Sequence, residues 1–398
     1  MTVRLSLSLI ATLAALPACA QSFERGERNT DLQPQDPSQF RAPLETSDIE
    51  ISQDVVASGL EHPWGIEVLP DGGGYLVTER PGRLRHVAPD GTLSDPISGV
   101  PEVVAERQGG LLDVALSPDF AETRRVYLSY AKPVGDNLSA TAAAYGTLSE
   151  DLSSLTDVTD IFVQTPGSTA PMHFGSRVVF DDAGHVFVTT GEHSTRKYRH
   201  YAQDLDKTYG KVVRLTGDGD VPSDNPFVDT EGARPEIWSL GQRNIQGAMM
   251  RDGQLWTIEH GPQGGDELNL IEPGKNYGWP VISYGQNYNG STIGDGIAQM
   301  EGMEQPVYFW DPVIAPAGMM TYDGSAFADW QGDVLISSLY PGGIVRLELD
   351  GNTVAAEERV LMDLGRVRDV ETDADGTILL ITDQPDGALI RLSPATSG

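Results

Sequence analysis

The feature that most constrains the fold is a recurring turn. Six times along the chain, a turn rich in proline, aspartate or glycine leads into a short run of β-branched or aromatic residues: "LPDGGGYLVTER", "SPDFAETRRVYLSY", "FDDAGHVFVTTGE", "MRDGQLWTIEHG", "DWQGDVLISSLY" and "TDADGTILLITD". A second run of the same kind, such as "GKVVRL" or "GGIVRLEL", often follows. Strand, tight turn and strand is the sequence pattern of a β-hairpin. The sequence therefore predicts a chain built from repeated antiparallel hairpins.

The spacing of these turns predicts the architecture. They begin near Pro70, Pro118, Asp181, Arg251, Trp330 and Asp373, at intervals of 48, 63, 70, 79 and 43 residues. A four-stranded propeller blade needs about 40–50 residues, so we expect an all-β, six-bladed β-propeller. A β-sandwich is the alternative, but it rarely needs six similar hairpins. The longest intervals lie between the third and fifth turns, where added loop length favours a functional site.

The N-terminal region predicts export. Arg4, the apolar run from Leu5 to Leu16 and the small residues before Gln21 are typical of a signal peptide over residues 1–20. We therefore expect a periplasmic or secreted protein, with a lipid anchor on Cys19, the only cysteine, as the alternative. Residues 21–47 are polar and predict a linker or a surface-hugging arm, and residues 48–398 form the predicted propeller domain. No later segment is long and apolar enough to span a membrane.

The charge balance excludes some partners. The chain has 27 basic and 58 acidic residues, a formal net charge of −31. Such a chain repels nucleic acids and anionic membranes, so we expect neither as a partner. Acidity of this kind is typical of a soluble exported protein, and calcium binding is the second interpretation.

Several motifs contain residues suited to chemistry, but each also has a purely structural interpretation. The candidates lie in "SLGQRNIQG", "EHGPQGGDELNLIEPGKNYGWP" and "GRVRDVETDADG". Their arginines could form surface ion pairs of little energetic value. The sequence has no HExxH motif and no GxSxG elbow, which disfavours a histidine zinc site and a serine hydrolase. Four histidines are expected to be structural or exposed: His62, His86, His185 and His200.

Six segments in one order carry a resemblance to a known family. They are "HPWGIEVLPDGGGYLVTERPGRL", "QGGLLDVALSPDF", "HFGSRVVFD", "SLGQRNIQG", "EHGPQGGDELNLIEPGKNYGWP" and "RVRDVETDADG". Together they resemble the soluble sugar dehydrogenases that depend on pyrroloquinoline quinone (PQQ), and most closely their aldose sugar dehydrogenase branch. The resemblance extends from Leu60 to Leu392. It implies oxidation of an aldose at C1 to the lactone, with PQQ and Ca²⁺ as cofactors and an unknown electron acceptor.

The resemblance also implies roles for individual residues. His173, which alone would be interpreted as structural, takes the place of the general base. The implied cofactor-binding residues are Gln108, Arg243, Asn244, Arg366 and Arg368, and arginine suits the three carboxylates of PQQ. Calcium ligands are implied at the carbonyls of Gly261 and Pro262, and a second calcium site at Glu267 and Tyr277.

Two positions depart from the family pattern. Tyr340 stands where the family commonly has a lysine that contacts the cofactor, and we count it as a weaker cofactor-binding candidate. Met172 stands where the glucose-specific branch has an aspartate, which favours the aldose branch. Two other functions remain open: a calcium-dependent lactone or ester hydrolase, and a propeller that binds a partner without catalysis.

Overall fold

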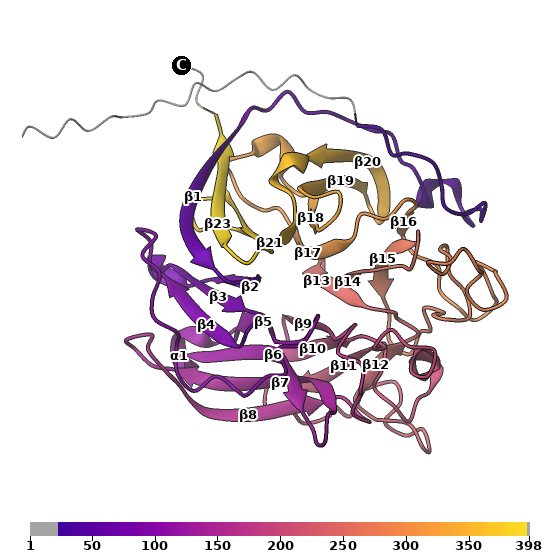
Figure 1. The fold of residues 1–398 in the computed structure, drawn as a ribbon, viewed down its shortest axis with the longest axis horizontal. Helices are drawn as coiled ribbons and strands as arrows, with labels where there is room; N and C mark the ends of the chain where they lie inside the picture. The colour runs from indigo at the N-terminus through magenta and orange to yellow at the C-terminus, as the bar shows by residue number, and fades with distance from the viewer. Residues whose placement is uncertain (1–22, 396–398) are drawn as a thin grey trace, which may run out of the picture.

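Six antiparallel sheets surround one central axis in the computed structural model, which describes residues 23–395 (Figure 1). This is the predicted six-bladed β-propeller. Each of the six recurring turns joins the first two strands of one blade, so the repeat in the sequence corresponds to the repeat of blades around the ring. The predicted signal peptide, with Cys19, lies outside the described residues. No helix within residues 23–395 is long and apolar enough to cross a membrane.

The strands follow one another around the ring. Blade 1 comprises β2 (Pro63–Val68), β3 (Tyr75–Glu79) and β4 (Arg83–Val87). Blade 2 comprises β5 (Leu111–Leu116), β6 (Arg125–Pro133), β7 (Ser139–Leu148) and β8 (Leu155–Val163). Blade 3 comprises β9 (Gly175–Phe180), β10 (His185–Thr190), β11 (Lys211–Thr216) and β12 (Ile237–Leu240). Blade 4 comprises β13 (Ile245–Arg251), β14 (Gln254–Glu259), β15 (Asp266–Ile271) and β16 (Tyr308–Trp310). Blade 5 comprises β17 (Pro316–Thr321), β18 (Val334–Ser338), β19 (Ile344–Asp350) and β20 (Thr353–Val360).

Blade 6 joins the two ends of the chain. It combines β21 (Val367–Thr372), β22 (Ile378–Thr382) and β23 (Gly387–Pro394) with β1 (Ile51–Leu60), which pairs antiparallel with β23 from Ile51–Pro394 to Leu60–Gly387. The N-terminal strand thereby closes the ring with the C-terminal one.

Helices are few and short, as the scarcity of helical periodicity predicts. The one α-helix is α1 (Phe120–Thr123) among residues 23–395. The 3-10 helices there are η1 (Pro37–Gln39), η2 (Pro70–Gly72), η3 (Arg199–Gln203), η4 (Ala328–Trp330) and η5 (Met362–Leu364). The helical segment within "YAQDLDKTYGKVVRL" is limited to the end of η3.

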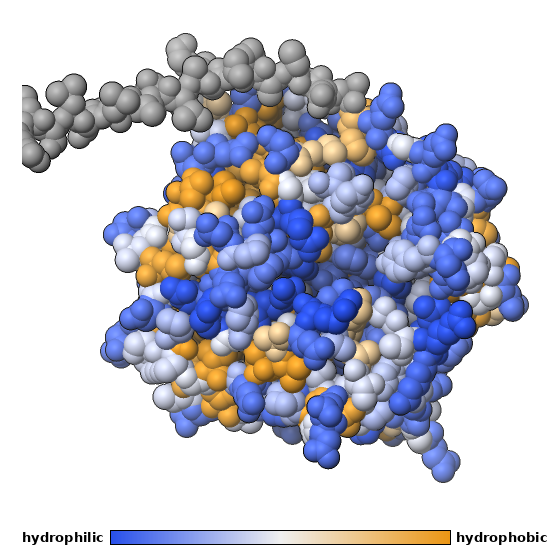
Figure 2. Space-filling model, in the orientation of Figure 1, coloured by the Kyte–Doolittle hydropathy of each residue, from blue (hydrophilic) through white to orange (hydrophobic). Residues whose placement is uncertain are grey.

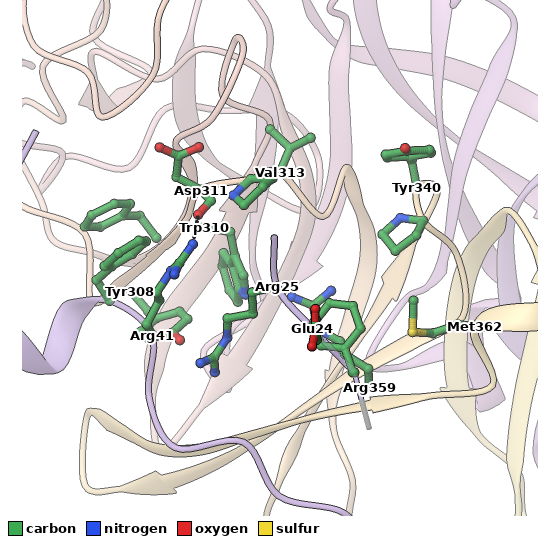
Figure 3. Close-up of a pocket in the computed structure, with 15 residues that line it drawn as sticks. Glu24, Arg25, Arg41, Tyr308, Trp310, Asp311, Val313, Tyr340, Arg359 and Met362 are labelled. Carbon is green, nitrogen blue, oxygen red and sulfur yellow. Dashed lines mark hydrogen bonds between the residues drawn. The ribbon is translucent and has the colours of Figure 1, made fainter. Parts of the chain in front are cut away.

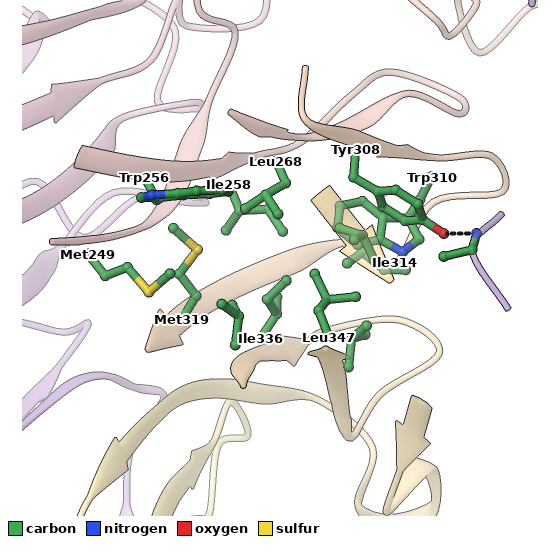
Figure 4. Packing of buried hydrophobic residues seen from close by; sticks show 14 residues of the cluster. Met249, Trp256, Ile258, Leu268, Tyr308, Trp310, Ile314, Met319, Ile336 and Leu347 are labelled. Atoms are coloured by element: carbon green, nitrogen blue, oxygen red, sulfur yellow. Dashed lines mark hydrogen bonds between the residues drawn. The ribbon is translucent and has the colours of Figure 1, made fainter. Parts of the chain in front are cut away.

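The core lies between neighbouring blades. The faces of each blade are covered by its neighbours, so strands such as β18 and β22 are buried along their whole length. Between blades 4 and 5, Trp256 and Ile258 from one sheet pack with Met319 and Ile336 from the next (Figure 4). The exposed side chains on the face shown in Figure 2 are largely hydrophilic, with scattered apolar ones, as the charge predicts.

Residues 23–47 lie as an arm along blades 4 and 5. Phe40 stacks on Phe309 with ring centroids 4.6 Å apart, and Phe309 stacks in turn on Tyr284. The backbone N–H of Asn29 donates to Asp311 Oδ1 at 2.9 Å. The arm therefore extends the buried surface of the propeller on one side.

A buried ion-pair network lies where the six innermost strands meet. Arg177 on β9 donates to Asp113 Oδ1 on β5 at 2.8 Å, to Asp369 on β21 at 2.9 and 3.0 Å, and to the Gln246 carbonyl on β13 at 2.7 Å. Asp369 also accepts from an N–H of β2. On β17, a Cβ added to Gly318 would lie 1.6 Å from Asp369 Oδ1, so only glycine fits there. All six blades thus contact one cluster of charges.

We expect Arg177→Met to destabilise the fold by about 3–5 kcal/mol, because it leaves two buried carboxylates without their partner. The measurement is the free energy of unfolding in denaturant. Arg125→Met is the matched control: it removes an exposed pair with Asp218 and should cost less than about 1 kcal/mol. Equal losses in the two variants would show that the network around Arg177 contributes no more to stability than an exposed ion pair.

Candidate active site

A polar cavity of about 190 Å³ lies among the ends of the innermost strands. Every blade contributes to its wall, which is lined by Trp64, Arg80, Gln108, Leu112, Phe174, Gly175, Asn244, Gln246, His260, Ala315, Leu339, Arg366 and Arg368. The cavity combines three arginines, amides and a few apolar side chains, which suits a polar or anionic ligand held in a fixed orientation.

His173 lies beside this cavity, directly before β9. Its side chain is buried, and its backbone N–H donates to Gln108 Oε1 at 2.8 Å. Its ring Nδ1 lies 3.1 Å from Glu192 Oε1, a carboxylate just beyond the end of β10. The pair forms because β9 and β10 are antiparallel and Gly175 lies opposite Thr190, which brings the residues beyond those ends together. Nε2 has no hydrogen-bond partner among the described residues.

Electrostatics keep this imidazole neutral. Burial and the neighbouring Arg243 lower the pKa of His173, and Glu192 only partly offsets them. Burial works to raise the pKa of Glu192, but the interaction with His173, together with Arg243 and Arg199, holds that pKa below its ordinary value. The charged carboxylate of Glu192 therefore accepts a hydrogen bond from Nδ1–H of His173, which leaves the ring lone pair on Nε2. A neutral, oriented imidazole of this kind is the usual form of a general base.

Two of the predicted arginines share one carboxylate. Arg368 is buried and donates to Asp383 Oδ2 at 2.6 Å and to Gln246 Oε1 at 3.2 Å. Arg366 donates to the same Asp383 oxygen at 2.8 Å, although half of its side chain is exposed. Two guanidinium groups on one carboxylate leave a net positive charge at the cavity wall, so both can still bind an anion.

The other predicted polar residues tie neighbouring blades together. Asn244 Oδ1 accepts from the Gly175 N–H at 3.1 Å, which links blades 3 and 4. Arg243 is buried, donates to the His260 carbonyl at 2.8 Å and has an Nε without a partner. An unsatisfied buried donor is costly, so this Nε is a candidate to bind a ligand oxygen. The donors around the cavity therefore fit a planar polyanion such as PQQ.

Tyr340 does not join this group. Its side chain is 68% exposed and lines a different cavity, of about 260 Å³, between the arm and blades 4 and 5 (Figure 3). Only its neighbour Leu339 reaches the cavity beside His173. In the second cavity Arg25 and Arg359 are already paired with Glu357, so it offers less free positive charge.

The four predicted calcium-binding residues line a third, very small cavity of about 10 Å³. Gly261, Pro262, Glu267 and Tyr277 meet there with Glu259. Burial raises the pKa of Glu259 to about 7, and burial together with Glu259 raises that of Glu267 well above its ordinary value. Two carboxylates that disfavour each other's charge beside carbonyl oxygens fit a hard cation such as Ca²⁺. No group of three or more histidine, aspartate, glutamate or cysteine side chains surrounds a common metal position within residues 23–395, so carbonyls would have to complete the ligand set.

Asp266 builds the bend between these residues. Its carboxylate accepts from the N–H groups of Gly261, Ile314 and Ala315, each at 2.8 Å. A Cβ at Gly261 would lie 2.2 Å from the carbonyl of Gly265, so the bend requires glycine. The nearby His260 is no base, because its Nε2 donates to the Pro316 carbonyl at 2.6 Å and burial lowers its pKa to about 3.

Comparison with known proteins identifies the family. The sequence model of the glucose/sorbosone dehydrogenases matches residues 60–391. The chain belongs to the glucose/sorbosone dehydrogenase family. This membership makes it an oxidoreductase, as the resemblance of the six segments predicts. Aldose sugar dehydrogenase YliI of Escherichia coli K12 is 45% identical over 353 residues, which cover 88% of this chain and 93% of that protein.

Solved structures of the dehydrogenase family share the fold. The soluble aldose sugar dehydrogenase of Escherichia coli, in its apo form, is 45% identical with a TM-score of 0.84, covering 87% of this chain and 100% of that one. The PQQ-bound aldose sugar dehydrogenase of Streptomyces coelicolor is 27% identical with a TM-score of 0.69, again covering 87% and 100%. Both neighbours carry the name of the branch that the sequence favours.

Sequence reasoning missed Glu192 and Arg80 in this dehydrogenase. Glu192 stands in "TTGEH", at the end of the same hairpin that begins with His173, so the pairing of hairpin ends could have found it. Arg80 lies in "TERPGRL", at the end of β3, and lines the cavity with Arg366 and Arg368.

We expect Glu192→Gln to lower the pKa of His173 further, because it removes the negative charge that favours the protonated ring. The amide can still accept from Nδ1, so the ring orientation should be kept. NMR titration of the imidazole resonances, assigned with a His173 variant, measures this. Asp181→Asn removes the carboxylate beside His185 and should leave the titration of His173 unchanged. A rise in the pKa of His173 in the Glu192 variant would contradict the assigned role.

Proposed function

We propose that the chain is a PQQ- and calcium-dependent dehydrogenase that oxidises an aldose at C1 to its lactone. The observation that carries the proposal is the neutral His173, oriented by Glu192, beside a cavity walled by arginines. The family membership supports the sugar substrate, and the PQQ-bound relative supports the cofactor. The N-terminal segment supports export to the periplasm or beyond.

Each side chain has a task in this reaction. When bound, PQQ supplies the hydride acceptor. His173 Nε2 takes the proton of the anomeric hydroxyl while the hydride leaves C1, so the sugar loses two electrons and two hydrogens and becomes the lactone. Glu192 stabilises the imidazolium that forms. Arg366, Arg368 and Arg243, with Asn244 and Gln108, would hold the carboxylates and oxygens of the cofactor and orient the sugar.

Calcium would bind at the glycine–proline bend and beside it. The carbonyls of Gly261 and Pro262 suit the ion that the resemblance implies at the cofactor, and Glu267 with the Tyr277 carbonyl suits the second one. The closed geometry of the bend, fixed by Asp266, would present these oxygens without further rearrangement.

The hydrolase alternative needs carboxylates and amides that converge on a metal at the propeller axis. The axial carboxylates here, Asp113 and Asp369, are instead occupied by Arg177. A propeller that only binds a partner has no need for an oriented histidine–glutamate pair. The geometry therefore favours the dehydrogenase.

Reconstitution of the purified protein tests the proposal. The protein is incubated with PQQ and Ca²⁺ and desalted, and the reduction of an artificial dye is followed with a panel of aldoses. We expect retained quinone absorbance and sugar-dependent dye reduction. A protein that retains no quinone and reduces no dye with any sugar would refute the proposal.

We expect His173→Ala to retain PQQ but to lose about 10²–10⁴-fold in kcat, since the general base is absent. Stopped-flow reduction of the bound quinone measures the loss directly. Substitution of the exposed His200 by alanine is the control and should leave the rate unchanged. Turnover at the native rate in the His173 variant would remove this residue from the mechanism.

Calcium should stabilise the protein more at high pH than at low pH. Because burial raises the pKa of Glu259 to about 7, the calcium-free protein gains stability below the unfolded pKa and loses it as the pH rises through about 7. Added Ca²⁺ therefore should raise the Tm more at pH 8 than at pH 5.5.

Glu267→Gln should shrink this calcium-dependent rise in Tm, whereas Glu272→Gln, an exposed carboxylate nearby, should keep it. Thermal unfolding with calcium and with a chelator measures both. An unchanged rise in Tm with calcium in the Glu267 variant would show that the ion does not bind at Glu267.

A further inference from the structure

One of the three arginines that line the cavity beside His173 has no partner in the protein. Arg366 and Arg368 share the carboxylate of Asp383. Arg80, which follows β3 directly, also lines the cavity. Its side chain forms no hydrogen bond and no salt bridge in the part of the chain that the structure describes. The charge of Arg80 is therefore the one on the cavity wall that the protein leaves unpaired.

The carboxylates of the neighbouring segments are bound by other arginines. Glu79, the residue before Arg80, is fully buried and accepts from Arg83 at 2.7 Å and from Arg85 at 3.2 Å. Glu61 accepts from Arg83 at 2.8 Å. The hairpin of β3 and β4 therefore directs its other arginines to carboxylates and leaves Arg80 to the cavity.

The backbone fixes the position of Arg80 from two sides. Its N–H donates to the His62 carbonyl, before β2, and its carbonyl accepts from the N–H of Leu111, the first residue of β5, both at 3.1 Å. A Cβ added to Gly110 would lie 1.9 Å from the Arg80 carbonyl oxygen and 2.5 Å from its Cγ, so only glycine fits beside it. The side chain therefore starts from a defined point at the edge of the cavity.

The guanidinium group of Arg80 is accessible to a ligand. The residue is half-buried, yet none of its nitrogen atoms is among the enclosed donors that lack a partner, in contrast to Nε of Arg243. Its unpaired donors are therefore open to the cavity or to solvent. A guanidinium group in this state can bind a carboxylate through two parallel charge-assisted hydrogen bonds.

The cavity needs this charge because position 340 does not supply one. The Tyr340 side chain lines the other cavity, and only the apolar Leu339 reaches the wall beside His173. On that wall, the two arginines of blade 6 minus Asp383 leave one positive charge, and Arg80 brings the total to two. A ligand with three carboxylates is held better by the larger charge.

We propose that Arg80 is a cofactor-binding residue, which binds a carboxylate of PQQ and supplies the positive charge that Tyr340 does not. An aldose carries no charge, so the carboxylates of the cofactor are the anions that the proposed reaction brings to this cavity. This inference rests on the proposed dehydrogenase function and adds a cation from blade 1 to those of blades 4 and 6.

The test measures PQQ binding directly. The native protein and Arg80→Gln, both freed of cofactor, are titrated with PQQ in the presence of Ca²⁺, and the absorbance of the bound quinone gives the Kd. Loss of a charge-assisted hydrogen bond should raise the Kd about tenfold or more. Added salt should weaken binding less in the variant than in the native protein, because one charge pair is absent. A native Kd in Arg80→Gln would overturn the proposal.

Arg83→Gln is the matched control, because Arg83 lies on the same hairpin but is paired with Glu79 and Glu61. It should lower the midpoint of unfolding in denaturant and leave the Kd for PQQ unchanged. Arg80→Gln removes no ion pair, so its midpoint should stay at the native value. An equal rise of Kd in the two variants, or an equal fall of the midpoint, would assign Arg80 to the hairpin rather than to the cofactor.

Two further results separate this inference from the proposed function. If the native protein binds PQQ but oxidises no aldose, the proposed reaction fails, and the comparison of Kd values still decides the role of Arg80. If the native protein binds no PQQ, both fail as stated. Calorimetric titration with trimesate, a planar aromatic tricarboxylate, then tests the cavity as an anion site. Weaker binding to Arg80→Gln than to the native protein would keep Arg80 as a carboxylate-binding residue, and equal or absent binding would overturn that as well.

Discussion

The ion-pair network around Arg177 is the interaction on which the rest of the structure depends. A charge that is buried in the middle of six strands is tolerated only if its hydrogen bonds are satisfied, and here Asp113, Asp369 and the Gln246 carbonyl satisfy them. Because these partners come from different blades, the network fixes the blades relative to one another. Gly318 lets the fifth blade approach as closely as the others.

This anchor also sets the position of the base. Arg177 and His173 are four residues apart at the start of the same blade, so the arginine reaches the axis while the histidine lies before the strand. The β10 end, held against β9 by backbone pairing, then brings Glu192 to the imidazole. The spacing in "HFGSR" therefore couples the centre of the fold to the chemistry at its edge, and neither residue could shift along the strand alone.

The sequence predicts those parts of the molecule that depend on local chemistry. Turn residues are required wherever a blade begins, so the six hairpins are visible without any long-range information. The pairing of β1 with β23 and the network of Arg177 join residues that are far apart in the chain, and no local pattern reports them. The predicted residues Gln108, Asn244, Arg366 and Arg368 line one cavity, and His173 lies beside it, because each is found near the same end of an innermost strand.

The directions of the Tyr340 and Arg199 side chains could not be predicted from the sequence. The position of Tyr340 follows from its motif, but the direction of its side chain depends on the turn at "SSLYPGG", which presents Leu339 to the cavity instead. Arg199 lies in the connection between β10 and β11, which has no periodicity, so its contact with Trp279 depends on the path of residues 191–210. Such loop geometry is determined by tertiary contacts rather than by neighbours in the sequence.

The charges around the site set the protonation state of its candidate base. Arg243 and Arg199 lower the pKa of His173, and Glu192 acts against them. The two arginines therefore keep the imidazole in the neutral form that can take a proton, and Glu192 orients the ring so that Nε2 is left without a partner.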